Sequence, residues 1–217
     1  MKREEIFRNT EVLYLEIKGY VSYDLIKFVT ENAGKRILDL GCATGEYSKK
    51  LTELGYNCVG VDINSKYVEM ARKEGLESYV MSAENLNFPN DYFDSVLLFE
   101  VLEHVDDPYD VLKEAVRVTK KNILISVPNS TKFNELIGQG LTYEHMLESD
   151  HKNFFTKNEL EDLLSKISNK FKVEEVVPLP LGVINLPLWL KYPILFLYKC
   201  KIIKSNIFYR LIGIVEV

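Results

Sequence analysis

The sequence predicts an α/β protein built on a doubly wound, mostly parallel β-sheet with helices on both faces. From residue 36 to about residue 127, short apolar segments typical of strands alternate with amphipathic segments typical of helices. Val96–Phe99 (VLLF) and Ile123–Ser126 (ILIS) are almost continuously apolar, as strands buried on both faces are. In such a fold right-handed crossovers place the carboxyl ends of the strands, and therefore the ligand, at one edge of the sheet.

Local patterns predict the individual elements. Residues 4–30 interleave apolar and charged side chains, which favours a helix. Asn64 is an N-cap for a following helix, and Thr156 with Glu159 forms the pattern of a capping box. The expected helices cover 4–30, 46–54, 65–74, 109–119 and 156–168, and the expected strands cover 36–40, 58–61, 78–81, 95–99, 122–127 and 172–177.

At 217 residues the chain is expected to form a single domain. Its expected parts are an N-terminal helical cap (1–33), a ligand-binding core (34–128), a polar and aromatic insertion on the substrate side (129–155), the remainder of the core (156–180) and an apolar, basic tail (181–217). The tail is rich in proline and aromatic residues, and its pattern does not choose between helix and strand.

Charge is distributed unevenly along the chain. The net charge of −5 disfavours a general nucleic-acid binder. From Gly182 onward five basic residues face one acidic residue, so this part carries +4 and the rest of the chain −9. The three cysteines, Cys42, Cys58 and Cys200, have no metal-binding or disulfide spacing, and the charged N-terminus has no apolar signal segment. We therefore expect a cytoplasmic protein.

The segment Ile37–Ser48 (ILDLGCATGEYS) reads as strand, small-residue turn and helix start, and Asp62 follows at the end of the next strand. Gly41, Ala43 and Gly45 are small, and glycine adopts the positive φ angles that such a turn needs. Helix N–H groups then point at a ligand, and Asp62 is placed to accept hydrogen bonds from a ribose. No Lys-Ser/Thr pair follows Gly45, which excludes a phosphate-binding P-loop.

The D-x-G-x-A-x-G spacing resembles motif I of class I S-adenosylmethionine (SAM)-dependent methyltransferases, and Phe88–Pro108 resembles that family's stretch through its fourth strand. The resemblance runs from about residue 34 to residue 128. It implies a Rossmann-like sheet of seven strands, SAM as cofactor and S-adenosylhomocysteine as product. The cofactor-binding residues that it implies are Asp39, Gly41, Ala43, Gly45, Asp62, Ile63, Ala83, Glu84 and Glu100.

A second group of residues follows the fourth strand. Glu100, Glu103 and His104 would share one face of a helical turn, and His151 follows in a DHK sequence. The combination resembles the ubiquinone-pathway O-methyltransferases and the family that methylates 2′-hydroxyls at small-RNA 3′ ends, in which such residues hold Mg²⁺. By that resemblance Glu100, Glu103, His104 and His151 would bind a divalent cation. Alternatively, His104 or His151 acts as the catalytic base with Glu100 beside it, or these residues only cap a helix and order a loop.

The function expected from the sequence is SAM-dependent methyl transfer to a small-molecule acceptor. The acceptor atom is expected to be a hydroxyl oxygen, and a lipid-linked or glycan precursor is the candidate acceptor. The alternatives are a metal-dependent RNA 2′-O-methyltransferase, a non-catalytic SAM-binding partner subunit and an NAD oxidoreductase; the missing third glycine counts against the last of these.

The apolar tail suggests an interaction surface. Leu186–Tyr198 is too short and too interrupted to span a bilayer, but its aromatic and basic residues fit a membrane interface. A substrate lid or a homodimer contact is the alternative.

Overall fold

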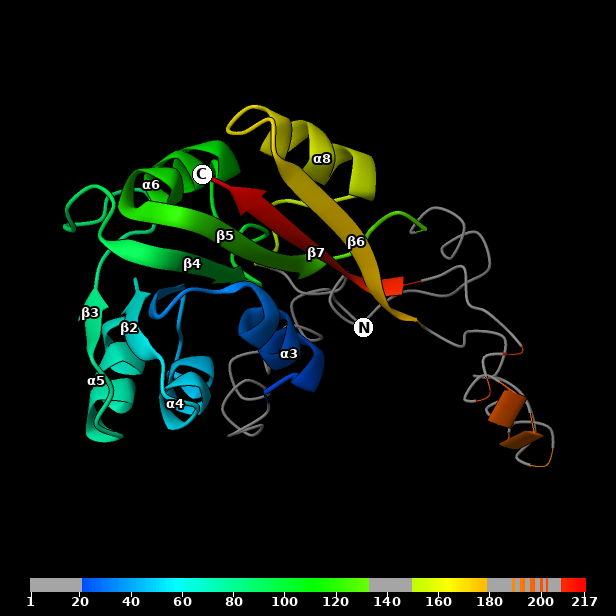
Figure 1. The fold of residues 1–217 in the computed structure, drawn as a ribbon, viewed down its shortest axis with the longest axis horizontal. Coiled ribbons are helices and arrows are strands. Elements are labelled where there is room, and N and C mark those ends of the chain that lie inside the picture. Colours follow the sequence, from blue (N-terminus) through cyan, green and yellow to red (C-terminus); the bar gives the residue numbers. More distant parts are fainter. Residues whose placement is uncertain are drawn as a thin grey trace, which may run out of the picture.

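The computed structural model describes residues 21–132, 150–178 and 208–217, together with a few separate positions between 189 and 202. Its sheet has seven strands in the order β3-β2-β1-β4-β5-β7-β6 (Figure 1). The strands are β1 (Arg36–Leu40), β2 (Asn57–Asp62), β3 (Ser78–Val80), β4 (Phe93–Phe99), β5 (Thr119–Pro128), β6 (Phe171–Pro178) and β7 (Phe208–Glu216). The described helices are α3 (Tyr23–Asn32), α4 (Glu46–Glu53), α5 (Ser65–Lys73), α6 (Pro108–Val118) and α8 (Lys157–Ser165).

The sheet is parallel except at β7, so the predicted fold class is confirmed. Strands β1 to β5 pair in parallel, whereas β7 runs antiparallel to both β5 and β6. The carboxyl ends of the parallel strands therefore meet at one edge, and β7 begins at the same edge. Ligands of open α/β sheets bind there.

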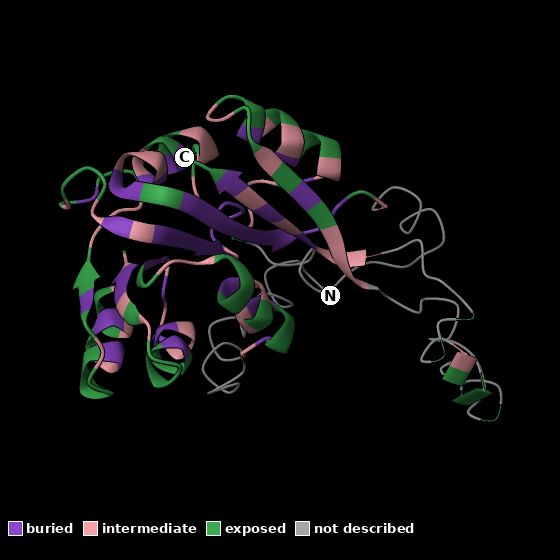
Figure 2. Cartoon of the chain, viewed as in Figure 1, coloured by how far each residue is buried: buried purple, intermediate pink, exposed green. Residues whose placement is uncertain are grey.

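Each face of the sheet is covered by helices, which explains the continuous apolar runs in its central strands. Figure 1 shows α6 and α8 on one side of the sheet and α3, α4 and α5 on the other. In β1, Leu38 packs into the cluster on the α6 and α8 side, and Ile37 packs with Leu25 and Leu51 on the α3 and α4 side. Figure 2 shows the buried central strands between helices whose outer faces are exposed.

Local signals place most helix ends correctly. The Asn64 side chain accepts a hydrogen bond from Lys66 N, and Thr156 and Glu159 form both halves of the predicted capping box. Only the end of the first expected helix (4–30) is described: α3 begins after Ser22 and continues two residues past the expected end, to Asn32, before the extended backbone of Ala33. Residues 1–20 lie outside the described residues, as do 133–149 of the expected insertion.

The end of the expected tail is a strand of the sheet. Residues 208–216 form β7, with Leu211 and Val215 buried in the core on the α8 side. The opposite face of β7 is also half-buried and apolar, so the run lacks the strict alternation that would have marked a strand. Residues 179–207 are therefore a connection between β6 and β7. No helix in the described part of the chain is long and apolar enough to cross a membrane.

Candidate functional site

A tight turn joins β1 to α4 at the ligand edge. The φ angles of Gly41 and Gly45 are +82° and +84°, and that of Ala43 is +45°. The Gly41 and Cys42 amides both donate to the Val61 carbonyl, at 2.7 and 2.9 Å, so the turn is tied to the end of β2. The two glycines thus adopt the left-handed conformations for which glycine is suited, whereas Ala43 adopts a conformation that is uncommon for a residue with a Cβ.

We expect Gly45→Ala to destabilise the protein more than Gly75→Ala. Both glycines have a left-handed φ, at +84° and +83°, where an L side chain costs about 1–2 kcal/mol. A Cβ at Gly45 would lie 2.4 Å from Leu76 Cδ1, whereas at Gly75 it would meet no atom within 4 Å. The end of the Leu76 side chain can move, but Ala71 Cβ, 3.2 Å away, is fixed on α5, so overpacking should add about 1 kcal/mol, the lower end of its usual range. The difference should appear in the free energies of unfolding from urea titrations, and equal losses would contradict the close packing at Gly45.

Asp62, at the end of β2, is held across the turn. Its Oδ2 accepts a hydrogen bond from Ala43 N at 2.9 Å, and its Oδ1 accepts one from Asn64 N at 2.8 Å. An ionised carboxylate offers about four acceptor positions, so two remain for hydroxyl donors. The neighbouring Ile63 side chain is exposed. The structure therefore places a fixed carboxylate and an exposed apolar side chain together beside the turn.

Asp39 supports the turn from within the sheet. It is buried, and its Oδ2 accepts a 2.7 Å hydrogen bond from the Ser48 hydroxyl at the start of α4. Burial raises the pKa of this carboxyl to about 6, and the Ser48 hydrogen bond limits the rise.

The raised pKa of Asp39 predicts a loss of stability as the pH rises from about 4 to about 6. In this window the unfolded chain has released the proton, at the ordinary value of 3.8, while the folded protein still holds it. The stabilisation is thus fully present below the unfolded pKa and is lost by the folded pKa, about 3 kcal/mol in all for a shift of roughly two units. Urea titrations across this range should show that Asp39→Asn lacks this decline. Parallel curves for variant and wild type would contradict the assignment.

Residues after β3 approach the same edge. Met81 N donates to the Asp62 carbonyl at 3.1 Å, and the Ser82 hydroxyl accepts from Glu84 N at 3.3 Å in a small turn. Ala83 packs partly against the core, and Glu84 is exposed. The predicted cofactor positions Ala83 and Glu84 therefore come shortly after β3. Because β3 pairs with the end of β2, they lie near the same edge of the sheet as Asp62.

Glu100 lies apart from the other predicted cation ligands. Its Oε1 accepts hydrogen bonds from the Ser126 hydroxyl at 2.6 Å and from Arg210 Nε at 3.1 Å. Its own φ is +54°. The expected helical face of Glu100, Glu103 and His104 is therefore not formed; the chain makes a short turn instead, in which His104 N donates to the Val101 carbonyl.

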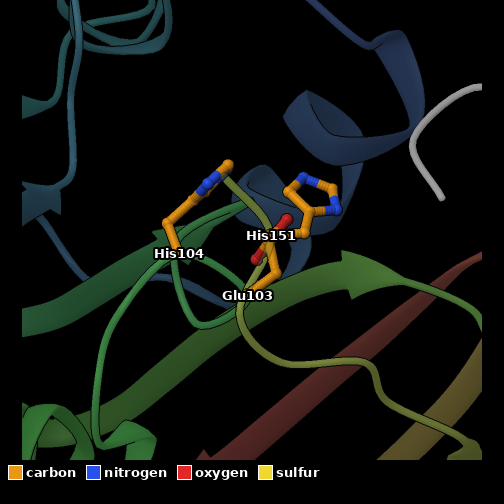
Figure 3. A group of neighbouring side chains, drawn as sticks. All are labelled: Glu103, His104 and His151. Carbon is orange, nitrogen blue, oxygen red and sulfur yellow. The ribbon is translucent and has the colours of Figure 1, made fainter. Parts of the chain in front are cut away.

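Glu103, His104 and His151 do come together (Figure 3). One ligand atom from each lies within 4.8 Å of the others. Glu103 is only 1% exposed, and the two imidazole rings lie 4.7 Å apart, edge to face. A buried carboxylate needs charged or hydrogen-bonding partners, and the imidazoles are in position to provide them.

Backbone contacts fix His151 against the turn after β4. The amides of Lys152 and Asn153 both donate to the Glu103 carbonyl, at 2.7 and 3.0 Å. The Asn153 side-chain amide donates to the carbonyls of Leu102 and Val105. Two segments that are almost 50 residues apart in sequence are thus joined by four hydrogen bonds, which fix His151 beside Glu103 and His104.

The donor set of this group fits a divalent cation. Two imidazoles and one carboxylate suit first-row metals such as Mn²⁺, Fe²⁺ or Zn²⁺. Asp150 Oδ2 lies 3.3 Å from His104 Nδ1, where it can orient this imidazole as second-shell carboxylates do. The same arrangement suits a His acting as a base, and the two roles remain alternatives.

Sequence reasoning missed several partners of these residues. Ser126 and Arg210 hold Glu100, and Asn153 positions the His151 segment. Only Asp150 had a signal, because it belongs to the quoted DHK sequence. Arg210 had none, since it lay in the segment without an assigned structure.

Comparisons with known proteins identify a methyltransferase domain within the chain. Residues 38–126 match the family model of a methyltransferase domain. The ubiquinone biosynthesis O-methyltransferase of Xanthomonas oryzae pv. oryzae is 32% identical over 120 residues, which cover 51% of this chain and 50% of that protein. The enzyme of the same name from Aliivibrio fischeri is 28% identical over 166 residues, covering 65% and 68%. The chain spans about half the length of the first of these relatives.

Solved structures show the same fold. A SAM-dependent methyltransferase from Archaeoglobus fulgidus superposes with a TM-score of 0.69 at 21% identity, covering 95% of this chain and 99% of the other. A SAM-dependent methyltransferase from Thermotoga maritima, described as a possible histamine N-methyltransferase, gives 0.63 at 23% identity, covering 89% and 87%. The fold that the resemblance in motif I implied is thereby confirmed.

Proposed function

Because residues 38–126 match a methyltransferase domain and the chain has the SAM-dependent methyltransferase fold, we propose that it transfers a methyl group from SAM to a hydroxyl oxygen of a small molecule. The observation that carries this proposal is the Asp62 carboxylate, fixed by two backbone amides beside the Gly41–Gly45 turn. The glycine turn would lie under the amino-acid part of SAM, and Asp62 would accept from its ribose hydroxyls.

The Glu103, His104 and His151 group supports an oxygen acceptor. These residues would hold a divalent cation, which would polarise an acceptor hydroxyl and favour its ionised form. Without a cation, an imidazole of the group would remove the proton as a general base. In either version Glu103 and His104 lie in the turn after β4, with the His151 segment bound against it, at the edge where SAM is proposed to bind.

Three further observations favour this proposal over its rivals. The curated relatives are named O-methyltransferases, and the match to this chain covers 50% of one and 68% of the other. The net charge of −5 disfavours an RNA substrate, whose phosphates are bound by basic residues. A non-catalytic SAM-binding subunit would have no need of a buried carboxylate and two histidines brought together on two segments that four hydrogen bonds join.

The proposal is tested by isothermal titration calorimetry of the full chain with SAM, S-adenosylhomocysteine and NAD. We expect both SAM species to bind and NAD to give no heat of binding. Binding of NAD without SAM would overturn the proposal. Binding of SAM, with no methyl transfer from labelled SAM to any member of a panel of phenolic, glycan and lipid-linked alcohols, would favour the non-catalytic alternative.

A further inference from the structure

The connection between β6 and β7 begins and ends at the ligand edge of the sheet. Pro178, at the end of β6, pairs with Phe208 at the start of β7, and Pro128 of β5 pairs with Arg210. Arg210 in turn donates to Glu100 directly after β4. Both ends of the connection at 179–207 are therefore attached to the sheet beside the proposed site of methyl transfer.

Several described positions in this connection expose large apolar side chains. Trp189 is 74% exposed, Tyr192 68%, Phe196 64% and Ile202 68%. Positions 189, 192 and 196 each have helical backbone. A cluster of exposed aromatic side chains of this kind marks an interaction surface.

The charge of the connection complements an anionic surface. Residues 179–207 contain four lysines and no acidic residue, so they carry +4 while the rest of the chain carries −9. Basic residues interleaved with Trp, Tyr and Phe are the composition of segments that lie in a membrane interface. The attraction between lysines and an anionic leaflet adds to the burial of the aromatic rings.

We propose that the connection at 179–207, with Trp189, Tyr192, Phe196 and Ile202 as its apolar contacts, binds the surface of an anionic membrane. It attaches at the ligand edge, so binding turns the proposed methyl-transfer site toward the lipid headgroups. If the proposed function holds, on which this step rests, the acceptor hydroxyl belongs to an amphipathic or lipid-linked molecule presented at that surface. Contact with a second copy of the chain is the competing occupant.

The single tryptophan of the chain provides a direct measurement, because it is Trp189. The full chain is titrated with vesicles of phosphatidylcholine and phosphatidylglycerol, and in parallel with vesicles of phosphatidylcholine alone, at low and at high salt. Anionic vesicles at low salt should shift the emission of Trp189 to shorter wavelength and protect it from iodide. High salt should weaken the effect, since it shortens the Debye length.

A matched pair of variants tests the electrostatic part. Lys199→Gln/Lys201→Gln should lower partition into anionic vesicles on the order of tenfold or more, as expected from the attraction of each lysine to the leaflet. Lys120→Gln/Lys121→Gln removes the same charge from exposed positions at the amino end of β5, at the opposite edge, and should leave partition unchanged. Trp189→Ala/Phe196→Ala, followed by co-sedimentation, tests the apolar contacts and should also reduce binding.

The possible results distinguish membrane binding from contact with a second copy of the chain. Absence of binding to every vesicle, equal binding to neutral and anionic vesicles, or equal loss in the two lysine pairs would each overturn the proposal. A blue shift that depends on protein concentration without lipid would assign the surface to a second copy instead. SAM calorimetry on the same variants keeps the two proposals apart, because the connection variants should bind SAM as the wild type does even where membrane binding is lost.

Discussion

Glu103→Gln is expected to remove divalent-cation binding from the protein if the cluster with His104 and His151 is a cation site. The substitution keeps the size of the side chain but replaces the buried carboxylate, the one anionic ligand among the three donors. Loss of a second-shell partner already costs about 10- to 100-fold in metal affinity, so loss of a ligand should cost more. Calorimetric titration with Mn²⁺ and Zn²⁺ measures the affinity without needing to know the acceptor.

Two aspartates near the cluster provide a graded control. Asp150→Asn should weaken cation binding by about 10- to 100-fold, because Asp150 orients His104 from the second shell. Asp106→Asn, an exposed carboxylate paired with Lys152 in the same loops, should leave it unchanged. A wild-type protein that binds neither ion would eliminate the cation, and full methyl transfer by His151→Ala would then exclude this histidine as the base.

The sequence predicts best those features that are set by neighbours in the chain. The cofactor turn is predictable because Gly41 and Gly45 meet a local demand for left-handed φ. The position of Asp62 is predictable because only one helix and one strand separate it from this turn. The capping box of α8 is equally local. By contrast, the arrangement of Glu100 depends on Ser126 in the next strand and on Arg210, which is 110 positions away.

The position of β7 illustrates the same limit. Its pairing between β5 and β6 is set by contacts across the sheet, and a connection of 29 residues separates it from β6. Local pattern alone therefore could not distinguish a strand from the end of an apolar tail. Composition did identify the connection as basic and aromatic, and the structure adds that both of its ends lie at the ligand edge.

Asp62→Ala is expected to weaken SAM binding by about 1.5–3 kcal/mol, or roughly 10- to 150-fold, which is the value of hydrogen bonds to a charged acceptor. The variant also releases the amides of Ala43 and Asn64, so its loss of stability must be separated from its loss of affinity. Asp94 provides the matched control, because its carboxylate likewise accepts from two backbone amides, those of Lys35 and Arg36, but at the opposite end of β1.

Asp94→Ala should therefore lower the free energy of unfolding while leaving SAM affinity near that of the wild type. Asp62→Asn, which keeps one amide oxygen as an acceptor but loses the charge, should have an affinity between those of wild type and Asp62→Ala. Calorimetry with SAM and urea titrations of all three variants measure both quantities. Equal losses of SAM affinity in Asp62→Ala and Asp94→Ala would mean that Asp62 acts through the stability of the turn and does not contact the ribose, and the cofactor would then have to be placed by the glycine turn alone.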